Sequence, residues 1–93
     1  MRELTWDDFA DAAGTTYAIE VGDDRIDLTL DRVEQLPHSP RATGAFRLEF
    51  LGPLDRLLPQ AIYPFSGEGE TVEIFIVPIA REPAGVRYEA VFF

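Results

Sequence analysis

The sequence predicts a mostly β domain of the α+β class: a small antiparallel rolled sheet or open barrel of about six strands, with one short N-terminal helix. Three observations support this prediction. Apolar and polar residues alternate with a period of two in several short segments. Turns rich in Gly, Pro or Asp separate these segments, and helical spacing is confined to the N-terminus. With 93 residues, the chain is expected to form a single domain over residues 1–93 with one modest core.

The N-terminal segment has the signals of a short helix. Thr5 is a suitable N-cap, and Asp8 lies three residues later, where a capping box places an acid. Apolar residues recur at helical spacing from Trp6 to Ala13, and Gly14 then occupies the position at which a helix commonly ends. A helix of about two turns is marginal in isolation, so we expect it to pack against the sheet.

Residues 15–21 and 25–31 form the first predicted hairpin. In both segments apolar residues alternate with polar ones, and a Gly-Asp-Asp turn at 22–24 joins them. The alternation breaks after Leu30. A β-bulge near Asp31–Arg32 would restore the pattern and let the strand continue, whereas without a bulge the strand would end there. The bulged, continuing strand is our preferred interpretation.

The rest of the chain supplies the remaining strands. Pro37 and Pro40 frame a loop, and the Gly-Pro pair at 52–53 interrupts the alternation again. Residues 54–58 have the spacing of a single helical turn. Short turns join the later strands, as is typical of antiparallel hairpins. These predicted strands cover residues 46–50, 60–65, 71–79 and 86–93.

Two prolines fall within predicted strands, where a missing N–H interrupts the hydrogen-bond ladder. Pro64 marks an edge or an end of its strand. We interpret Pro78 as a strand end or bulge that limits pairing and protects an edge, and the alternative is a corner at which the sheet bends. Residues 71–79 are apolar on both faces. One face is expected to line the interior and the other to pack against the N-terminal helix through Trp6 and Phe9.

The chain is strongly acidic, with a formal net charge of −9 at pH 7. Residues 1–34 hold ten acids and three arginines, so most of this charge lies there. An acidic surface repels nucleic acids and anionic membranes, and we expect neither as a partner. Arg47 and Arg87 lie on predicted strands with acidic neighbours and are expected to form cross-strand ion pairs.

The absence of cysteine from the sequence excludes disulfides, thiolate catalysis and Cys-ligated metal sites. The N-terminus lacks the apolar segment of a signal peptide. No apolar run approaches the ~18 residues that a membrane helix needs. We therefore expect a cytoplasmic protein with no membrane segment.

The reactive residues form no pattern that indicates an active site. His38, the only histidine, lies in a Pro-rich loop and is expected to be exposed, and Ser39 beside it lacks the surroundings of a nucleophile. The acids at 23–27 do not have the spacing of an EF-hand loop, and the Gly-Glu-Gly-Glu run at 67–70 has no Lys for a phosphate. We expect no catalytic residue, no metal and no cofactor.

The apolar residues point instead to binding. Those near the middle and the end of the chain exceed what one face of a small sheet needs. The last strand is also a candidate for edge pairing with another chain. We predict a non-catalytic interaction or assembly module that contacts a protein partner or a second copy of itself. Its candidate contact residues are Leu54, Leu57, Leu58, Val91, Phe92 and Phe93.

Two other function classes remain open. The number of Phe and Tyr residues would suit a barrel that encloses a small apolar ligand, although barrels of this size usually fill their interior with side chains. An enzyme would need polar groups that converge on a cleft, and His38 would be its best candidate.

The second half of the chain also carries a resemblance. Its sequence blocks, in order, are Phe46–Pro53, Leu58–Tyr63, Ile74–Ile79 and Tyr88–Phe92. In these blocks the chain resembles a family of small bacterial proteins classified as a domain of unknown function, whose genes often neighbour phage-tail-collar-like proteins. The resemblance implies an accessory or assembly role. It implies no catalytic residues, because none is established for the family, and it makes Pro78 part of the family signature.

Overall fold

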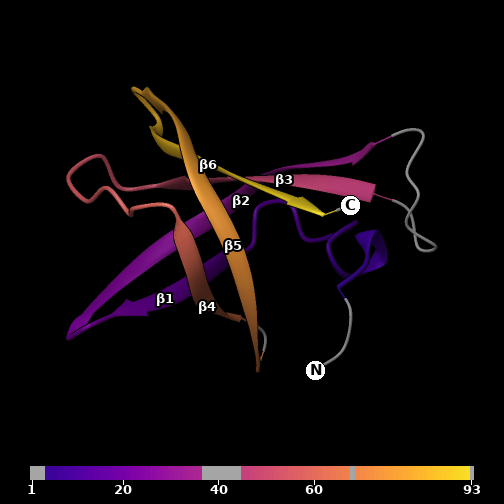
Figure 1. The fold of residues 1–93 in the computed structure, drawn as a ribbon, viewed down its shortest axis with the longest axis horizontal. Coiled ribbons are helices and arrows are strands. Elements are labelled where there is room, and N and C mark those ends of the chain that lie inside the picture. Colours follow the sequence, from indigo (N-terminus) through magenta and orange to yellow (C-terminus); the bar gives the residue numbers. More distant parts are fainter. Residues whose placement is uncertain (1–3, 37–44, 68, 93) are drawn as a thin grey trace.

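Six antiparallel strands make up nearly all of the fold (Figure 1). The computed structural model describes residues 4–36, 45–67 and 69–92. The mostly β class predicted from the alternating pattern is confirmed. The elements are a 3₁₀ turn η1 (Trp6–Asp8) and strands β1 (Thr16–Val21), β2 (Asp24–Leu36), β3 (Ala45–Gly52), β4 (Ala61–Gly67), β5 (Glu70–Glu82) and β6 (Gly85–Phe92).

The strands form one sheet that closes into a ring in the order β1-β2-β3-β6-β5-β4. Figure 1 shows β5 running steeply across β2 and β3, and β4 lying beside it across β1 and β2. The ring closes where β4 returns to β1 through two residue pairs, Ala18 with Ser66 and Ile19 with Phe65. β6 lies between β3 and β5, but its pairing with β5 covers only Gly85–Glu89. Most of the last strand is therefore not a sheet edge, and edge pairing of its end with another chain stays a prediction.

Two bulges shape the ring. The register between β2 and β3 shifts between Leu30 and Arg32, where the sequence predicts a bulge, and β2 continues beyond it. The register between β5 and β6 shifts between Pro78 and Ala80, and β5 likewise continues. Pro78 thus marks a bulge within a long strand, where the ladder is already irregular and a missing N–H is tolerated.

The N-terminal helix is shorter than predicted. η1 is a single 3₁₀ turn, although the Thr5 N–H donates a hydrogen bond to the Asp8 carboxylate at 2.7 Å, as in a capping box. Phe9 is then buried in the core, and the Gly14 N–H donates to the Leu30 carbonyl at 2.7 Å. Burial of Phe9 and this link to β2 outweigh the marginal stability of a two-turn helix. In the described ranges, no helix is long and apolar enough to cross a membrane.

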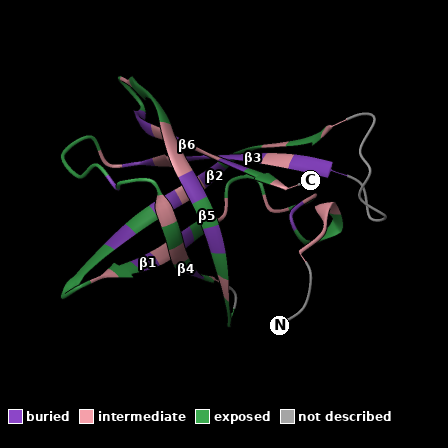
Figure 2. Ribbon diagram, in the orientation of Figure 1, coloured by how far each residue is buried: buried purple, intermediate pink, exposed green. Residues whose placement is uncertain are grey.

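Large side chains fill the interior of the ring, and Figure 2 shows buried positions on every strand. The ring centroids of Phe46 and Phe92 lie 4.5 Å apart, and those of Phe50 and Phe65 lie 4.9 Å apart. Each fully buried side chain of this size contributes about 1.5–3 kcal/mol. The least exposed side chains are Tyr88, Phe46, Phe50, Phe65, Ile19, Leu28, Leu30, Leu48, Ile74 and Ile76.

Candidate interaction surface

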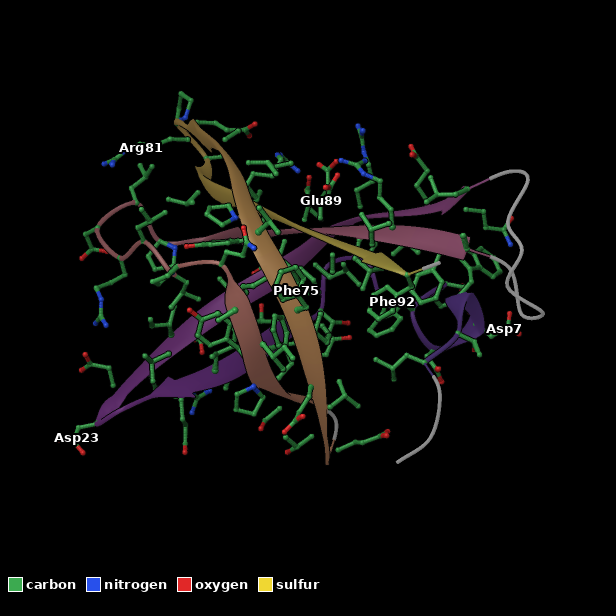
Figure 3. All side chains as sticks on the ribbon, in the orientation of Figure 1. Asp7, Asp23, Phe75, Arg81, Glu89 and Phe92 are labelled. Carbon is green, nitrogen blue, oxygen red and sulfur yellow. The ribbon has the colours of Figure 1, made fainter. Side chains whose placement is uncertain are left out.

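The outer side of β4 and β5 carries an exposed apolar face. Because Ile74 and Ile76 are buried in the core, Phe75 between them points outward, as Figure 3 shows. The register places Ile62 of β4 directly opposite Phe75, and the two residues are 63% and 47% exposed. Pro64 and Val77 lie two residues further along the same side of each strand. We define the apolar face by these four outward residues: Ile62, Pro64, Phe75 and Val77.

Trp6 and Phe9 do not cover this face. The ring centroid of Phe9 lies 5.9 Å from that of Phe46 and 6.4 Å from that of Phe92. Trp6 is partly buried against the same core. Figure 3 shows Phe92 near the N-terminal turn, well away from Phe75 in the view. The expectation that Trp6 and Phe9 pack on the outer face of β5 is therefore wrong.

The β3–β4 loop exposes two leucines, and hydrogen bonds to two tyrosine hydroxyl groups hold the conformation of the loop. Leu54 is exposed, and Leu57 is 66% exposed. The Leu58 N–H donates a hydrogen bond to the Tyr88 hydroxyl at 2.9 Å, and the Tyr63 hydroxyl donates to the Pro59 carbonyl at 2.7 Å. These bonds stabilise an irregular loop in place of the helical turn predicted at 54–58.

The other predicted contact residues divide between surface and core. Leu58 is only 2% exposed, so the prediction that it contacts a partner is wrong. Phe92 is half-buried and stacks on Phe46, so its ring belongs to the core packing. Val91 is exposed on the outer side of β6. Phe93 lies outside the described residues.

Sequence reasoning missed three exposed large apolar residues, which are Ile62, Phe75 and Ile79. A usable signal was present, because residues 71–79 are apolar on both faces and a closed ring can bury only one of them. The sequence-based prediction covers the second face with Trp6 and Phe9 instead. Once Phe9 is placed in the core, that face has to be exposed or to meet a partner.

The outer side of β3 and β6 is ionic. Glu49 of β3 lies directly opposite Glu89 of β6, an arrangement that is repulsive by itself. Arg47 bridges the two, with Nη2 at 2.5 Å from Glu49 Oε2 and Nε at 2.6 Å from Glu89 Oε2. Arg87 Nη1 contacts the other oxygen, Glu49 Oε1, at 2.8 Å. Glu49 is 5% exposed, and both its oxygens are held by guanidinium groups.

Further acids surround the two arginines. Arg87 contacts Asp31 at 2.8 Å and Glu82 at 2.9 Å, and Arg47 Nη1 lies 3.8 Å from Glu34. The predicted cross-strand ion pairs are thus confirmed as parts of a wider network. Two guanidinium groups face five carboxylates, which leaves an excess of three negative charges. We call this network the ionic wall: Asp31, Glu34, Arg47, Glu49, Glu82, Arg87 and Glu89.

The pKa shifts of the ionic wall follow from its hydrogen bonds. Bonds to Glu82 and Asp31 raise the pKa of Arg87, and the bond to Glu89 raises the pKa of Arg47. In turn, the hydrogen bond from Arg87 lowers the pKa of Glu82. The donors that a bound anion would require are engaged by the chain's own carboxylates. The arrangement is suited to holding β2, β3 and β6 together rather than to binding an anionic substrate.

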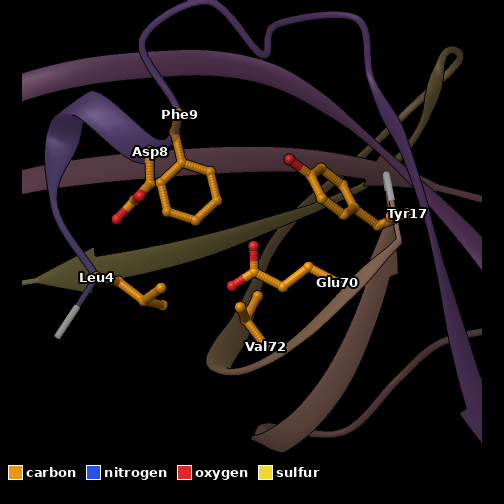
Figure 4. Close-up of a pocket in the computed structure, with 7 residues that line it drawn as sticks. Leu4, Asp8, Phe9, Tyr17, Glu70 and Val72 are labelled. Carbon is orange, nitrogen blue, oxygen red and sulfur yellow. The ribbon is translucent and has the colours of Figure 1, made fainter. Parts of the chain in front are cut away.

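Two hollows lie beside the N-terminal segment. The first, of about 120 Å³, is smaller than the roughly 300–1,000 Å³ of most ligand pockets. Figure 4 shows the Tyr17 hydroxyl and the Glu70 carboxylate turned toward it. Its lining residues are Leu4, Asp8, Phe9, Tyr17, Gly67, Glu70 and Val72. The second, of about 320 Å³, is lined by Thr5, Trp6, Asp7 and Gln35.

The polar residues that the sequence singled out do not converge in the structure as described. Asp27 pairs with Arg25 at 3.2 Å on the outer side of β2. Among the described residues, no group of three or more His, Cys, Asp and Glu is placed to hold a metal ion. Within the same ranges, each buried side-chain nitrogen or oxygen has a hydrogen-bond partner. His38 and Ser39 lie outside the described residues.

Comparison with known proteins adds a family to this description. The family described as "Domain of unknown function (DUF6916)" matches residues 4–92. No curated protein and no solved structure matches the chain.

Proposed function

Because the chain belongs to the DUF6916 family, whose function is unknown, we propose a function from its surface: it is a non-catalytic docking module that binds a protein partner through the apolar face. One observation carries the proposal. Ile62 and Phe75 lie directly opposite each other on the outer side of a ring whose interior is already filled. An outward pair of large apolar side chains adds nothing to that core, and contiguous apolar surface is typical of interaction sites.

The strands on which this pair sits make it a suitable anchor. Ile62 and Phe75 lie directly opposite each other within the seven-residue β4–β5 register, so a paired backbone presents both side chains. Binding to a preorganised surface loses little conformational entropy. Central aromatic anchors of this kind commonly contribute about 2 kcal/mol or more to an interface.

Docking would proceed through side chains rather than by addition of a strand. Each strand has two neighbours in the ring, but at the β1–β4 seam β1 pairs only with Phe65 and Ser66 of β4, and β6 pairs with β5 only from Val77 onward. Pro64 stands next to the last paired residue of that seam and has no N–H to offer. Prolines at such positions protect sheet edges from pairing.

The charged residues support the non-catalytic part of the proposal. Catalysis by acids, bases or nucleophiles needs polar groups that converge on a space for substrate. The most concentrated group of charges here, the ionic wall, is consumed by contacts among its own members. Such docking could take the form of an accessory role in assembling a larger particle. That role is implied by the resemblance to a family whose genes often neighbour phage-tail-collar-like proteins.

The alternative, a barrel that binds a small apolar ligand, has weaker support. Side chains from all six strands fill the ring, including four aromatic rings that are less than 2% exposed. The hollow that reaches Phe9 and Tyr17 has a volume of only about 120 Å³ and includes two carboxylates in its lining. An apolar ligand of ordinary size would have to displace core side chains.

Site-specific photo-crosslinking tests the proposal. A photoreactive phenylalanine analogue placed at position 75 in the full chain, in its native host, should give a discrete adduct that the second substitution Ile62→Asp abolishes. The same analogue at position 16, an exposed position on the outer side of β1, serves as the matched control. An adduct of twice the chain mass would identify self-association. Equal crosslinking from both positions would refute the apolar face as the docking site.

A further inference from the structure

We infer that the partner of the apolar face is a cationic protein segment, in which an apolar anchor is flanked by Arg or Lys. This inference rests on the proposed function and adds the chemical class of the partner. It follows from the charges that border the face, from the pairing of the nearby arginines and from the charge of the chain as a whole.

Acids border the apolar face on both sides. Glu73 is exposed on β5 and pairs with Pro64 across the strands, so it stands directly beside the face. It lies two residues from Phe75, a distance along the strand of roughly 7 Å. On the other side, Val77 lies directly opposite Glu89, which belongs to the ionic wall with its excess of three negative charges. A partner that covers Phe75 therefore brings its own flanking groups against carboxylates.

In the described ranges, no arginine forms an ion pair with Glu73. Arg47 and Arg87 are bound within the ionic wall. Further round the ring, Arg25 pairs with Asp27 at 3.2 Å, and Arg56 pairs with Asp24 at 2.9 Å. Glu73, on the β5 side of the face, is left to be compensated by a partner or by solvent ions.

Charge also argues against a second copy as the occupant. Two chains that each carry −9 repel one another, and their apolar faces would bring like-charged borders together. A cationic partner gains from the same field, because complementary charges steer association over a screening length of about 8 Å in physiological salt. The inference therefore commits to a different protein with basic residues next to its anchor.

Three synthetic peptides test the inference with the full chain. They share a Leu-Trp-Leu centre and carry on each side two Arg, two Gln or two Glu. In titrations of the ¹⁵N-labelled protein, the Arg peptide should shift the amides around Ile62 and Phe75 and bind at least about fivefold more tightly than the Gln peptide, because charge complementarity adds to the shared apolar contact. Its affinity should fall between about 50 and about 300 mM salt, as screening requires.

Variants assign the binding to this face. Phe75→Thr should abolish the shifts, and Glu73→Gln should weaken the Arg peptide about two- to fivefold without affecting the Gln peptide, since only one ion pair is lost. Ile62→Ser provides a second apolar variant, and circular dichroism verifies that each variant is folded.

The possible failures are distinguishable. Equal binding of the Arg and Gln peptides at Phe75 would overturn the cationic partner and leave the docking proposal standing. Unchanged binding of the Arg peptide to Phe75→Thr would show pairing with acids elsewhere on the chain, and it would overturn the inference. If no peptide binds at millimolar concentration, the inference is likewise overturned, and crosslinking at position 75 still decides the docking proposal independently.

Discussion

The ionic wall on β3 and β6 and the apolar face on β4 and β5 occupy the outer side of the same ring, yet their contacts differ in kind. In the ionic wall, Glu49 is 5% exposed and both its oxygens meet arginines from the same chain. On the apolar face, Ile62 and Phe75 lie opposite each other and are still 63% and 47% exposed. The ionic wall pairs its charged groups with one another, whereas the apolar face leaves apolar surface exposed to water.

This difference separates stability from binding. Removing a member of the ionic wall takes partners away from charges that are largely shielded from solvent, so the folded chain should lose stability. Removing a member of the apolar face takes away little that the folded chain uses, so stability should hardly change. Variants that affect only one of these properties would support this separation, and variants that affect both would contradict it.

The largest effect is expected for Glu49→Ala. This change leaves Arg47 and Arg87 next to each other without the carboxylate that joins them, although Glu89, Asp31 and Glu82 still contact the pair. We expect the free energy of unfolding, measured in urea, to fall by about 2–3 kcal/mol. Asp55→Ala, which removes an exposed acid from the β3–β4 loop, is the control and should change it by less than about 0.5 kcal/mol. If both variants lose an equally small amount of unfolding free energy, the ionic wall contributes no more than ordinary surface ion pairs.

A smaller effect is expected for Tyr88→Phe. The buried hydroxyl accepts the Leu58 N–H at 2.9 Å, and without it that donor loses its partner. We expect a loss of about 1–2 kcal/mol in the free energy of unfolding, and faster amide exchange at Leu58. Tyr63→Phe removes a hydroxyl that bonds the exposed Pro59 carbonyl, and it should lose less than about 1 kcal/mol. If the two variants are equally stable, Tyr88 does not hold the loop.

The pH dependence of stability should report the ionic wall and not the apolar face. Because the hydrogen bond from Arg87 lowers the pKa of Glu82, the ionised carboxylate stabilises the fold above its ordinary pKa, and this contribution is lost as pH falls through the lowered pKa. The raised pKa values of Arg47 and Arg87 add no titration at acidic pH, because both stay protonated there.

Urea unfolding at about pH 6 and about pH 3 measures this effect, since ordinary carboxyl groups titrate between these values. The stability difference between the unmodified chain and Glu82→Gln should shrink at the lower pH. Phe75→Thr should keep the full pH dependence of the unmodified chain. A Phe75→Thr variant with altered pH dependence would show that the apolar face and the ionic wall are energetically coupled.

Much of this architecture is readable from the sequence because it depends on local patterns. The two-residue period places Ile19, Leu28 and Leu48 in the core, and the broken period after Leu30 locates the bulge. The pairing of Arg47 with acids also follows from strand neighbours. These features need only the pleat of each strand and the identity of adjacent residues.

The remaining features depend on which distant segments meet, and no local pattern encodes that. Ring closure depends on two residue pairs between β1 and β4. Leu58 becomes a core residue because Tyr88, thirty residues away, holds its N–H. The exposure of Phe75 depends on where Phe9 packs, and a prediction that places the short helix over β5 therefore misses the candidate site. In each case tertiary packing overrides the local preference.

The smallest effect on stability, and the most informative about function, is expected for Phe75→Thr. Thr has a high strand propensity, and Phe75 is 47% exposed opposite Ile62, so the free energy of unfolding in urea should fall by less than about 1 kcal/mol. For this measurement the photoreactive analogue is placed at position 62. The crosslinked adduct that it forms should be lost in the Phe75→Thr variant. Val77→Thr, at the half-buried end of the apolar face, is the matched control and should retain more of the adduct. A large loss of stability in Phe75→Thr would mean that the fold itself requires this side chain. The ionic wall and the apolar face would then not differ in their roles in stability and binding.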